Sequence, residues 1–111
     1  MAVKPVKMFE GLLLANSATT VYTAPTGIAG VVAIKNITVT NSSSSAIHTV
    51  YVAIGAATTA TTVIVAKPLA PLETQSLADL VNQYISAGSI LQMWADTAAV
   101  VAAQGSGLIL T

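Results

Sequence analysis

One histidine and four carboxylates are the residues of this sequence that could carry acid–base chemistry. His48 lies in an alternating segment, on the same face as Val50 and Val52, which is typical of a packed or interfacial ring. The Gly-x-Ser-x-Gly turn that presents a serine nucleophile does not occur. Glycoside hydrolysis needs two carboxylates facing each other across a cleft, a pairing that the sequence leaves open for Glu10, Glu73, Asp79 and Asp96. We predict no catalytic residue and no enzymatic activity.

Metal and cofactor sites are not predicted either. The chain has no cysteine, so neither thiolate ligands nor disulfides are available. Calcium would require several oxygen ligands at close spacing, as in Asp-x-Asp-x-Asp, and the sequence contains no such cluster. Gly27 and Gly30 are not followed by the lysine and the helix of a phosphate-binding loop. We therefore predict no metal ion and no cofactor.

Trp94 is the obvious aromatic candidate for ligand binding. If exposed, its indole could stack on a sugar ring; if covered, it would pack on the core or at a subunit contact. We favour the covered position. The other aromatic residues are few: Phe9, Tyr22, Tyr51 and Tyr84.

The charged fraction of the sequence is unusually small. Only 7% of the 111 residues are charged, against about 25% in an ordinary globular chain. Fourteen threonines and nine serines must supply most of the surface polarity. Four scattered lysines do not form the cationic surface that nucleic-acid binding requires. A free monomer of this composition has little electrostatic protection against association, so we favour a subunit covered by its neighbours over a small threonine-rich monomer.

No apolar run approaches the roughly 18 residues of a membrane-spanning helix. Lys4 and Lys7 precede an apolar stretch at residues 12–15, as in a signal peptide, but Glu10 and Gly11 interrupt the run. We therefore expect a mature N-terminus, with secretion as the minor alternative, and no membrane partner.

Apolar and polar residues alternate with a period of two over much of the chain, which predicts strands with one buried face. In residues 31–41 the alternation is broken at Lys35, which falls among apolar residues. Turn-forming residues separate the segments at regular intervals, the last of them at 105–107. The predicted strands cover residues 18–23, 31–41, 47–54, 61–66, 90–95, 100–104 and 108–111. We predict an all-β chain, a single antiparallel β-sandwich or jelly-roll-like domain of about eight strands.

Two segments depart from this pattern. Residues 76–84 place Leu77, Leu80, Val81 and Tyr84 on one face of a possible two-turn helix, and we expect at most this one short helix. Residues 1–10 hold three of the eight charges, and Pro5 cannot donate to a strand ladder. We expect residues 1–10 to form an edge segment or an arm, and residues 11–111 to form the sandwich.

Two stretches resemble the small β-sandwich proteins encoded among the virion genes of tailed bacteriophages. In VYTAPTGIAGVVAIKNITVTNSSSSAIHTVYVAIG, a Tyr-Thr-x-Pro-x-Gly turn leads into a strand ending in Val-Thr-Asn, a serine-rich loop and a second strand. In LAPLETQSLADLVNQYISAGSILQMWADTAAVVAAQGSGLIL, a Leu-x-x-x-Glu-Thr segment precedes an apolar turn, an Ala-Gly-x-Ile strand and a closing Gly-x-x-Leu strand. The resemblance covers residues 22–110, and its motifs are structural.

The resemblance implies a non-enzymatic virion structural protein. Capsid decoration (cement) proteins of this kind sit on the shell lattice, usually as trimers, so we expect a homotrimer that binds the major capsid protein on the capsid surface after synthesis in the host cytoplasm. The alternative is a tail or head-fibre module that binds a host surface receptor through loops at 41–46 and 55–60. The residues that we expect at subunit or capsid contacts are Lys4, Pro5, Val6, Met8, Phe9, Leu12, Leu14 and Trp94.

Overall fold

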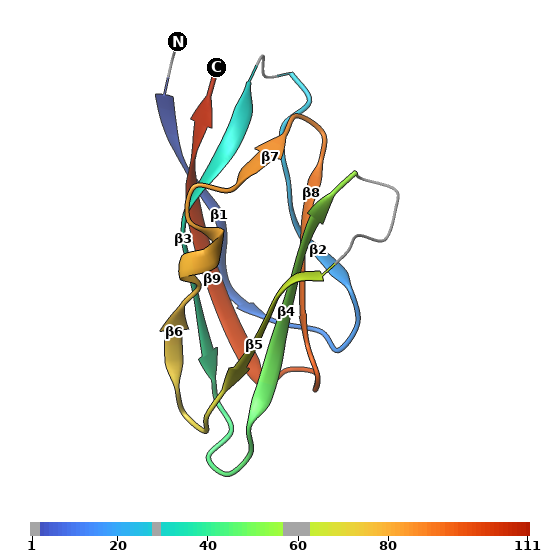
Figure 1. The fold of residues 1–111 in the computed structure, drawn as a ribbon, viewed down its shortest axis with the longest axis vertical. Helices are drawn as coiled ribbons and strands as arrows, with labels where there is room; N and C mark the ends of the chain where they lie inside the picture. Colours follow the sequence, from blue (N-terminus) through green and yellow to red (C-terminus); the bar gives the residue numbers. More distant parts are fainter. Residues whose placement is uncertain (1–2, 28–29, 57–62) are drawn as a thin grey trace.

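Nine strands in two antiparallel sheets make up most of the computed structural model, which describes residues 3–27, 30–56 and 63–111 (Figure 1). The strands are β1 (Val3–Leu13), β2 (Thr19–Thr23), β3 (Val31–Asn41), β4 (His48–Gly55), β5 (Val63–Leu69), β6 (Thr74–Ser76), β7 (Tyr84–Ser86), β8 (Ile90–Ala95) and β9 (Val101–Leu110). A single 3₁₀ turn, η1 (Ala78–Leu80), lies between β6 and β7. The predicted all-β sandwich is confirmed.

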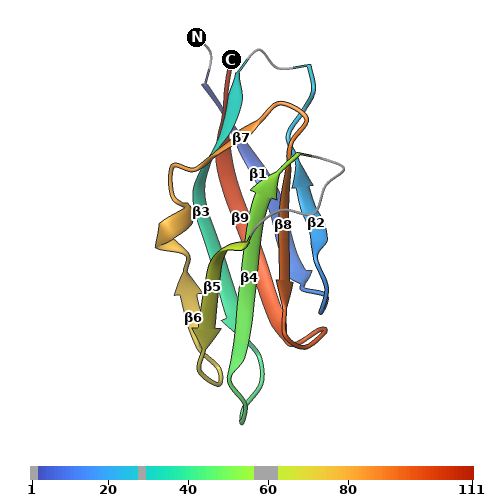
Figure 2. The same cartoon turned by 45° about the vertical axis from the view of Figure 1, so that its right-hand side comes forward.

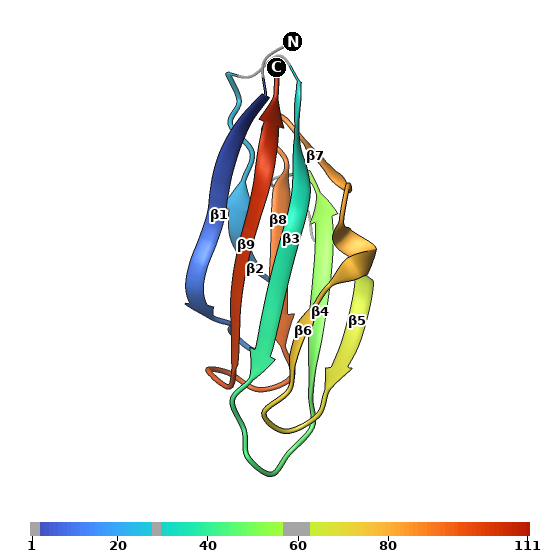
Figure 3. The same ribbon diagram turned by 90° about the vertical axis from the view of Figure 1, so that its left-hand side faces the viewer.

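The two sheets have the strand order of a jelly roll. One sheet has the order β1-β9-β3-β6, with β7 also paired to β3, and it faces the viewer in Figure 3. The other sheet has the order β2-β8-β4-β5 and comes forward in Figure 2. The chain crosses between the sheets after β1, β2 and β3, and again after β5, β7 and β8. The edges are therefore formed by β1 and by β6 with β7 in the first sheet, and by β2 and β5 in the second.

The core lies between the sheets and follows the predicted alternation. Val50 and Val52 of β4 are fully buried, as are Leu91 and Met93 of β8. The first sheet contributes the buried side chains Val32, Ile34, Ile37 and Val39 of β3. Full burial of one such side chain stabilises the fold by about 1.5–3 kcal/mol.

A β-bulge explains the break in the alternation at Lys35. The pairing between β3 and β9 shifts register between Ile34 and Asn36. Ile34 and Ile37 both face the core, because the bulge inserts one extra residue and so changes which face the later residues occupy. Lys35 is exposed there, and its Nζ donates to Oδ1 of Asn82 at 3.1 Å.

The predicted turn at 105–107 is wrong, because these residues lie inside the continuous strand β9. A Cβ atom on Gly105 would lie 2.8 Å from Cζ of Phe9, and one on Gly107 would lie 2.5 Å from the carbonyl oxygen of Ala33. The two glycines are needed for close approach within a sheet.

The predicted helix at 76–84 is also wrong. Only η1 is helical, and although Leu77 and Leu80 are buried, Val81 and Tyr84 are exposed. The backbone of this segment bonds to β3, with the Leu77 N–H donating to the Ile37 carbonyl at 2.8 Å. The segment thus follows the edge of β3 as two short strands with one turn between them.

The N-terminal residues form an edge strand. Residues 3–13 belong to β1, which pairs with β9, so the described part of the 1–10 segment continues without a break into residues 11–13. Pro5 is exposed on this edge. At the edge of the other sheet, β5 begins at Val63 and contains Pro68, so it extends beyond the predicted 61–66. Residues 57–62 of the predicted loop and strand lie outside the described residues, as do 28 and 29 between Gly27 and Gly30.

Candidate functional site

Three loops at one end of the sandwich are joined by side-chain and backbone hydrogen bonds. We call this the loop end; it comprises residues 42–47, 70–73 and 96–100, and lies at the bottom of Figure 1. Ser42 connects the first loop to the third, since its N–H and its hydroxyl both donate to the Val100 carbonyl, at 2.8 and 2.7 Å. The Leu72 N–H connects the second loop to the first by donating to the Ser43 carbonyl at 3.0 Å.

Asn41, the last residue of β3, holds the first two loops together. It is fully buried and is the only buried polar residue in the described part of the chain. Its Nδ2 lies 2.9 Å from the Ala46 carbonyl, 3.1 Å from that of Leu69 and 3.2 Å from that of Ala70. Its Oδ1 accepts from the Ser43 N–H at 3.0 Å. One side chain thereby satisfies backbone groups on both loops, which fixes their positions relative to each other.

Leu72 occupies a strained position in a tight turn. The Glu73 N–H donates to the Ala70 carbonyl at 3.0 Å and closes a four-residue turn, in which Leu72 is the third residue with φ of 59°. Turns with positive φ at the third position favour Gly or Asn. A left-handed backbone costs an ordinary residue about 1–2 kcal/mol. Positions of this kind cluster at functional sites, and among the described non-glycine residues Asn82 and Ala99 share the positive φ of Leu72.

The loop end also displays apolar side chains. Ile47 and Leu72 are each 65% exposed, which is the largest exposure of any large hydrophobic residue described. They belong to neighbouring loops that Asn41 and the Leu72–Ser43 hydrogen bond hold together. The result is an apolar pair on a rigid support, an arrangement suited to contact with another molecule.

His48 and Asp96 form a hydrogen-bonded pair that joins β4 to the end of β8. Nδ1 of His48 lies 2.8 Å from Oδ1 of Asp96, and Oδ2 of Asp96 accepts from the Thr49 N–H at 3.2 Å. Desolvation raises the pKa of Asp96, but the hydrogen bonds from His48 and Thr49 outweigh it, so the net pKa lies below its ordinary value. The pair orients the imidazole and keeps Asp96 ionised, and it connects two strands of one sheet.

Glu73 adds a second carboxylate to the loop end. Gln75 donates to its Oε2 at 2.7 Å, and the Ala70 N–H donates to its Oε1 at 2.8 Å. These two hydrogen bonds, in that order, lower the pKa of Glu73 below its ordinary value. Glu73 is therefore ionised at neutral pH, and with Asp96 it makes the loop end acidic.

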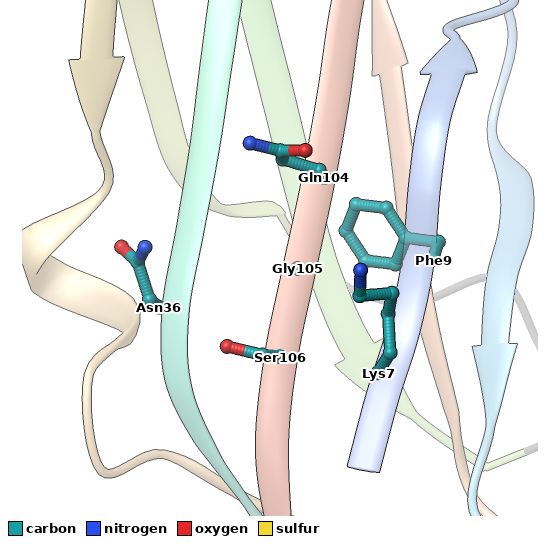
Figure 4. A pocket seen from close by; sticks show the side chains of 6 residues that line it. All are labelled: Lys7, Phe9, Asn36, Gln104, Gly105 and Ser106. Carbon is teal, nitrogen blue, oxygen red and sulfur yellow. The ribbon is translucent and has the colours of Figure 1, made fainter.

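A hollow opens on the outer face of the first sheet, between β1, β9 and β3 (Figure 4). Its volume is about 190 Å³, and we call it the sheet hollow. The exposed side chains of Lys7 and Gln104 border it, and the largely buried ring of Phe9 forms part of its wall. Its full lining is Lys7, Phe9, Asn36, Gln104, Gly105 and Ser106.

Uncharged polar side chains cover the rest of this outer face. Thr40 and Thr74 share a hydrogen bond of 2.8 Å between their hydroxyls, and the Ser76 hydroxyl donates to Oδ1 of Asn36 at 2.8 Å. A second hollow of about 100 Å³ lies farther along the same face, beside Gln104. The face is thus largely polar, and its charges are Lys35 at the bulge and the Lys7–Glu10 pair on β1.

Trp94 lies on the outer face of the other sheet. Its indole stacks on the ring of Tyr51, its direct cross-strand neighbour, with centroids 5.6 Å apart and planes inclined by 23°. Both rings are half-buried. The indole is not part of the core, so it remains available to a partner of this face.

The predicted contact residues divide by burial. Met8, Phe9 and Leu14 are 7%, 8% and 2% exposed and belong to the protein's own core, which leaves them little surface for another chain. Val6 and Leu12 are half-buried against that core. Lys4 and Pro5 are exposed on β1, and they remain predicted contact residues together with Trp94.

Sequence reasoning missed the residues that organise the loop end. Asn41 is predicted only as the end of a strand and the start of a serine-rich loop, and the sequence gives no prediction for Leu72. The Pro71-Leu72-Glu73 sequence offered a signal, because proline favours the second position of a tight turn and so puts Leu72 at the third. The pairing of His48 with Asp96, 48 residues apart, has no local signal.

No group of three or more His, Asp or Glu side chains that could hold a metal ion occurs among residues 3–27, 30–56 and 63–111. Within the same residues, no helix has the length and apolar character to cross a bilayer.

Comparisons with protein-family models, with curated proteins and with solved structures found no match to this chain.

Proposed function

We propose that this chain is a non-enzymatic structural protein of a tailed-phage virion, made in the host cytoplasm and assembled on the capsid surface. In this proposal it is a decoration (cement) protein that binds the lattice of the major capsid protein as a homotrimer. The observation that carries the proposal is the distribution of charge. Seven of the eight charged residues lie on the edge strands β1 and β5 or in the connections: Lys4, Lys7, Glu10, Lys67, Glu73, Asp79 and Asp96.

The eighth charged residue, Lys35, lies in the β3 bulge, where it bonds to Asn82. The central strands β8 and β4 of the second sheet therefore carry no Lys, Asp or Glu, whereas the first sheet carries Lys35 on β3 and the Lys7–Glu10 pair on its edge strand β1. Burial of an unpaired charge in an interface is costly, so uncharged faces can be covered without that cost. Strands of 10 and 11 residues in a sheet four strands wide offer a face of roughly 600–700 Å². This approaches the roughly 800 Å² per partner of a stable protein interface.

The fold supports the proposal by analogy only. Jelly rolls form viral capsid domains and also lectin domains, and one fold hosts many functions. The analogy is compatible with a shell protein and with a receptor-binding module.

The direct test is to locate the protein on intact particles of the phage that encodes it. Immunogold labelling or cryo-electron microscopy should place it on the head, and purified protein should bind expanded capsids and not immature ones. Because the broad faces carry few charges, binding should change little between about 50 and 500 mM salt, a range over which exposed charge pairs become screened. A protein located on the tail, or one that does not bind capsids, would contradict the proposal.

The loop end favours a second candidate, a tail or head-fibre module that binds a host surface receptor. Ile47 and Leu72 are exposed on loops that Asn41 holds in place, as expected of a module that binds a receptor through the end of its sandwich. Binding of the isolated protein to host cells, lost on substitution of these two residues, would favour this candidate over the first.

A further inference from the structure

A homotrimer requires two different contact surfaces on each chain. A patch that binds a copy of itself gives a two-fold dimer, whereas a closed ring of three needs one surface that docks on a second, distinct surface of the next chain. This molecule has two features that could serve as the two distinct surfaces of such a ring. One is a protruding apolar pair at the loop end, and the other is a recess on the outer face of the first sheet.

We propose, on the basis of the trimeric function above, that the loop end of one copy docks into the sheet hollow of the next copy. Leu72 enters the hollow beside Phe9 and Gly105, and Ile47 covers the adjoining surface. Glu73, the next residue along the turn, faces Lys7 of the neighbouring copy. The occupant of the hollow is thus a second copy of this chain.

The dimensions of the two surfaces agree. At about 190 Å³ the hollow is smaller than the roughly 300–1,000 Å³ of sites for drug-sized ligands, and it suits one or two side chains. Leu72 is 65% exposed and stands on a closed turn, so it can enter a recess with little rearrangement. Asn41 and the Leu72–Ser43 hydrogen bond fix the turn before docking, which limits the entropy lost on association.

The charges of the two surfaces are complementary. The loop end carries the carboxylates of Glu73 and Asp96, and the hollow carries the ammonium group of Lys7 at its border. In the single chain Lys7 lies 3.3 Å from Glu10, and these two side chains are 64% and 67% exposed. An exposed pair of this kind contributes little stability, so Lys7 can exchange Glu10 for the neighbour's Glu73.

The strain at Leu72 also points to a role in association. With φ of 59°, this position would be easier for Asn or Gly to occupy than for leucine. A leucine there destabilises the turn and exposes apolar surface, and a partner that covers the side chain would offset the second of these costs.

The experiment uses two variants of the full chain, one for each surface, and one control. Leu72→Asn removes the apolar group from a position whose backbone Asn tolerates. Ser106→Tyr fills the hollow from the outer face of β9. Leu13→Asn is the matched control, since Leu13 is 56% exposed but lies at the end of β1, outside both surfaces. Sedimentation equilibrium measures association, and the urea midpoint of each variant establishes that it is folded.

We expect wild type and Leu13→Asn to be trimers. Leu72→Asn and Ser106→Tyr should each associate about tenfold more weakly or worse, which corresponds to about 1.4 kcal/mol, and Leu72→Asn should keep or raise the urea midpoint. Mixed in equal amounts, the two monomeric variants should form one-to-one heterodimers, because the intact hollow of one can receive the intact loop end of the other. Glu73→Lys should weaken the trimer, and Lys7→Glu in the same chain should restore it.

Several results would overturn the inference. These are a Leu72→Asn variant that stays trimeric, a control that dissociates equally, a mixture that stays monomeric, or a wild-type protein that is not a trimer. If the wild type is a monomer and Leu72→Asn loses capsid or cell binding, the loop end binds another protein, and a second copy is not its partner. Capsid binding is measured separately, so the proposed location on the head can stand when this inference fails.

Discussion

Replacement of Asn41 by alanine should destabilise the whole fold more than replacement of any other loop-end side chain by alanine. The amide has two N–H groups, so two of its three close carbonyl contacts count as full hydrogen bonds, and its oxygen accepts a third from Ser43. At about 1 kcal/mol for each bond, the loss is about 3 kcal/mol. For a chain of this length such a loss lowers the melting temperature by about 12 °C.

Asn41→Asp should be worse than Asn41→Ala at neutral pH. The carboxylate keeps the bond from Ser43, but it places a buried negative charge against the carbonyl oxygens of Ala46, Leu69 and Ala70. Acidification protonates it and restores a donor, so the gap between the two variants should narrow as the pH falls.

Urea titrations followed by the fluorescence of the single tryptophan give both free energies. The matched control is Asn36→Ala on the same strand, because Asn36 is exposed and bonds to Thr38 and Ser76 at the surface. We expect the control to cost less than about 1 kcal/mol. If Asn41→Ala costs no more than the control, the loops are held by something other than this amide.

Three further predictions concern the rest of the sandwich. The folded-state pKa of Asp96 is lowered, so the stability that Asp96 contributes is present above its unfolded pKa of about 3.9 and is lost as the pH falls through the lower folded value. Asp96→Asn should therefore lower the urea midpoint at pH 7 and make the midpoint fall less on acidification. A pH profile of stability that is the same as that of the wild type would count against the pair with His48. Gly107→Ala should cost about 1–3 kcal/mol in urea unfolding, because its Cβ would meet the Ala33 carbonyl oxygen at 2.5 Å; a neutral result would mean that β9 can move away from β3. Tyr51→Ala should cost about 0.5–1.5 kcal/mol beyond the lost burial through the indole stack, and a double-mutant cycle with Trp94→Ala measures that coupling.

Periodicity predicted the sandwich well where the strands alternate cleanly. β3 and β8 have the predicted boundaries, β2 begins one residue later than predicted, and β4 is shifted by one residue at both ends. The broken alternation at Lys35 was informative too, since a charged residue among apolar ones marks the β3 bulge. The errors at β9 and η1 have a common cause. The glycines at 105 and 107 were interpreted as turn residues, and the spacing of apolar residues in 76–84 was interpreted as a helix, both from the local sequence alone. The structure is instead decided by distant contacts, those of the glycines with Phe9 and Ala33 and those of the 76–84 backbone with β3.

The loop end could be predicted only in part, because long-range partners create it. Asn41 reaches across 28 and 29 residues to the carbonyls of Leu69 and Ala70, and His48 reaches across 48 residues to Asp96. No pattern in a short window contains both members of such a pair. The exposure of Leu72 likewise depends on where the turn lies in the folded molecule. Composition nevertheless indicated the broader property, because a chain with only eight charged residues must have sparsely charged faces in any arrangement of its strands.

Substitutions at Leu72 should change the stability of the fold and the association of the chains in opposite directions, whereas substitutions at Phe9 should lower both. Phe9 packs against Gly105 on the core side of β9 and also helps to form the sheet hollow. Its truncation to alanine removes core packing worth about 3–5 kcal/mol and also reshapes the hollow. A loss of association in that variant therefore does not distinguish a damaged fold from a damaged contact. Leu72 is 65% exposed and so buries much less surface in its own chain than Phe9 does, and an asparagine in its place relieves the turn. A variant there that gains stability while losing assembly would locate the contact, because damage to the fold moves both properties in the same direction.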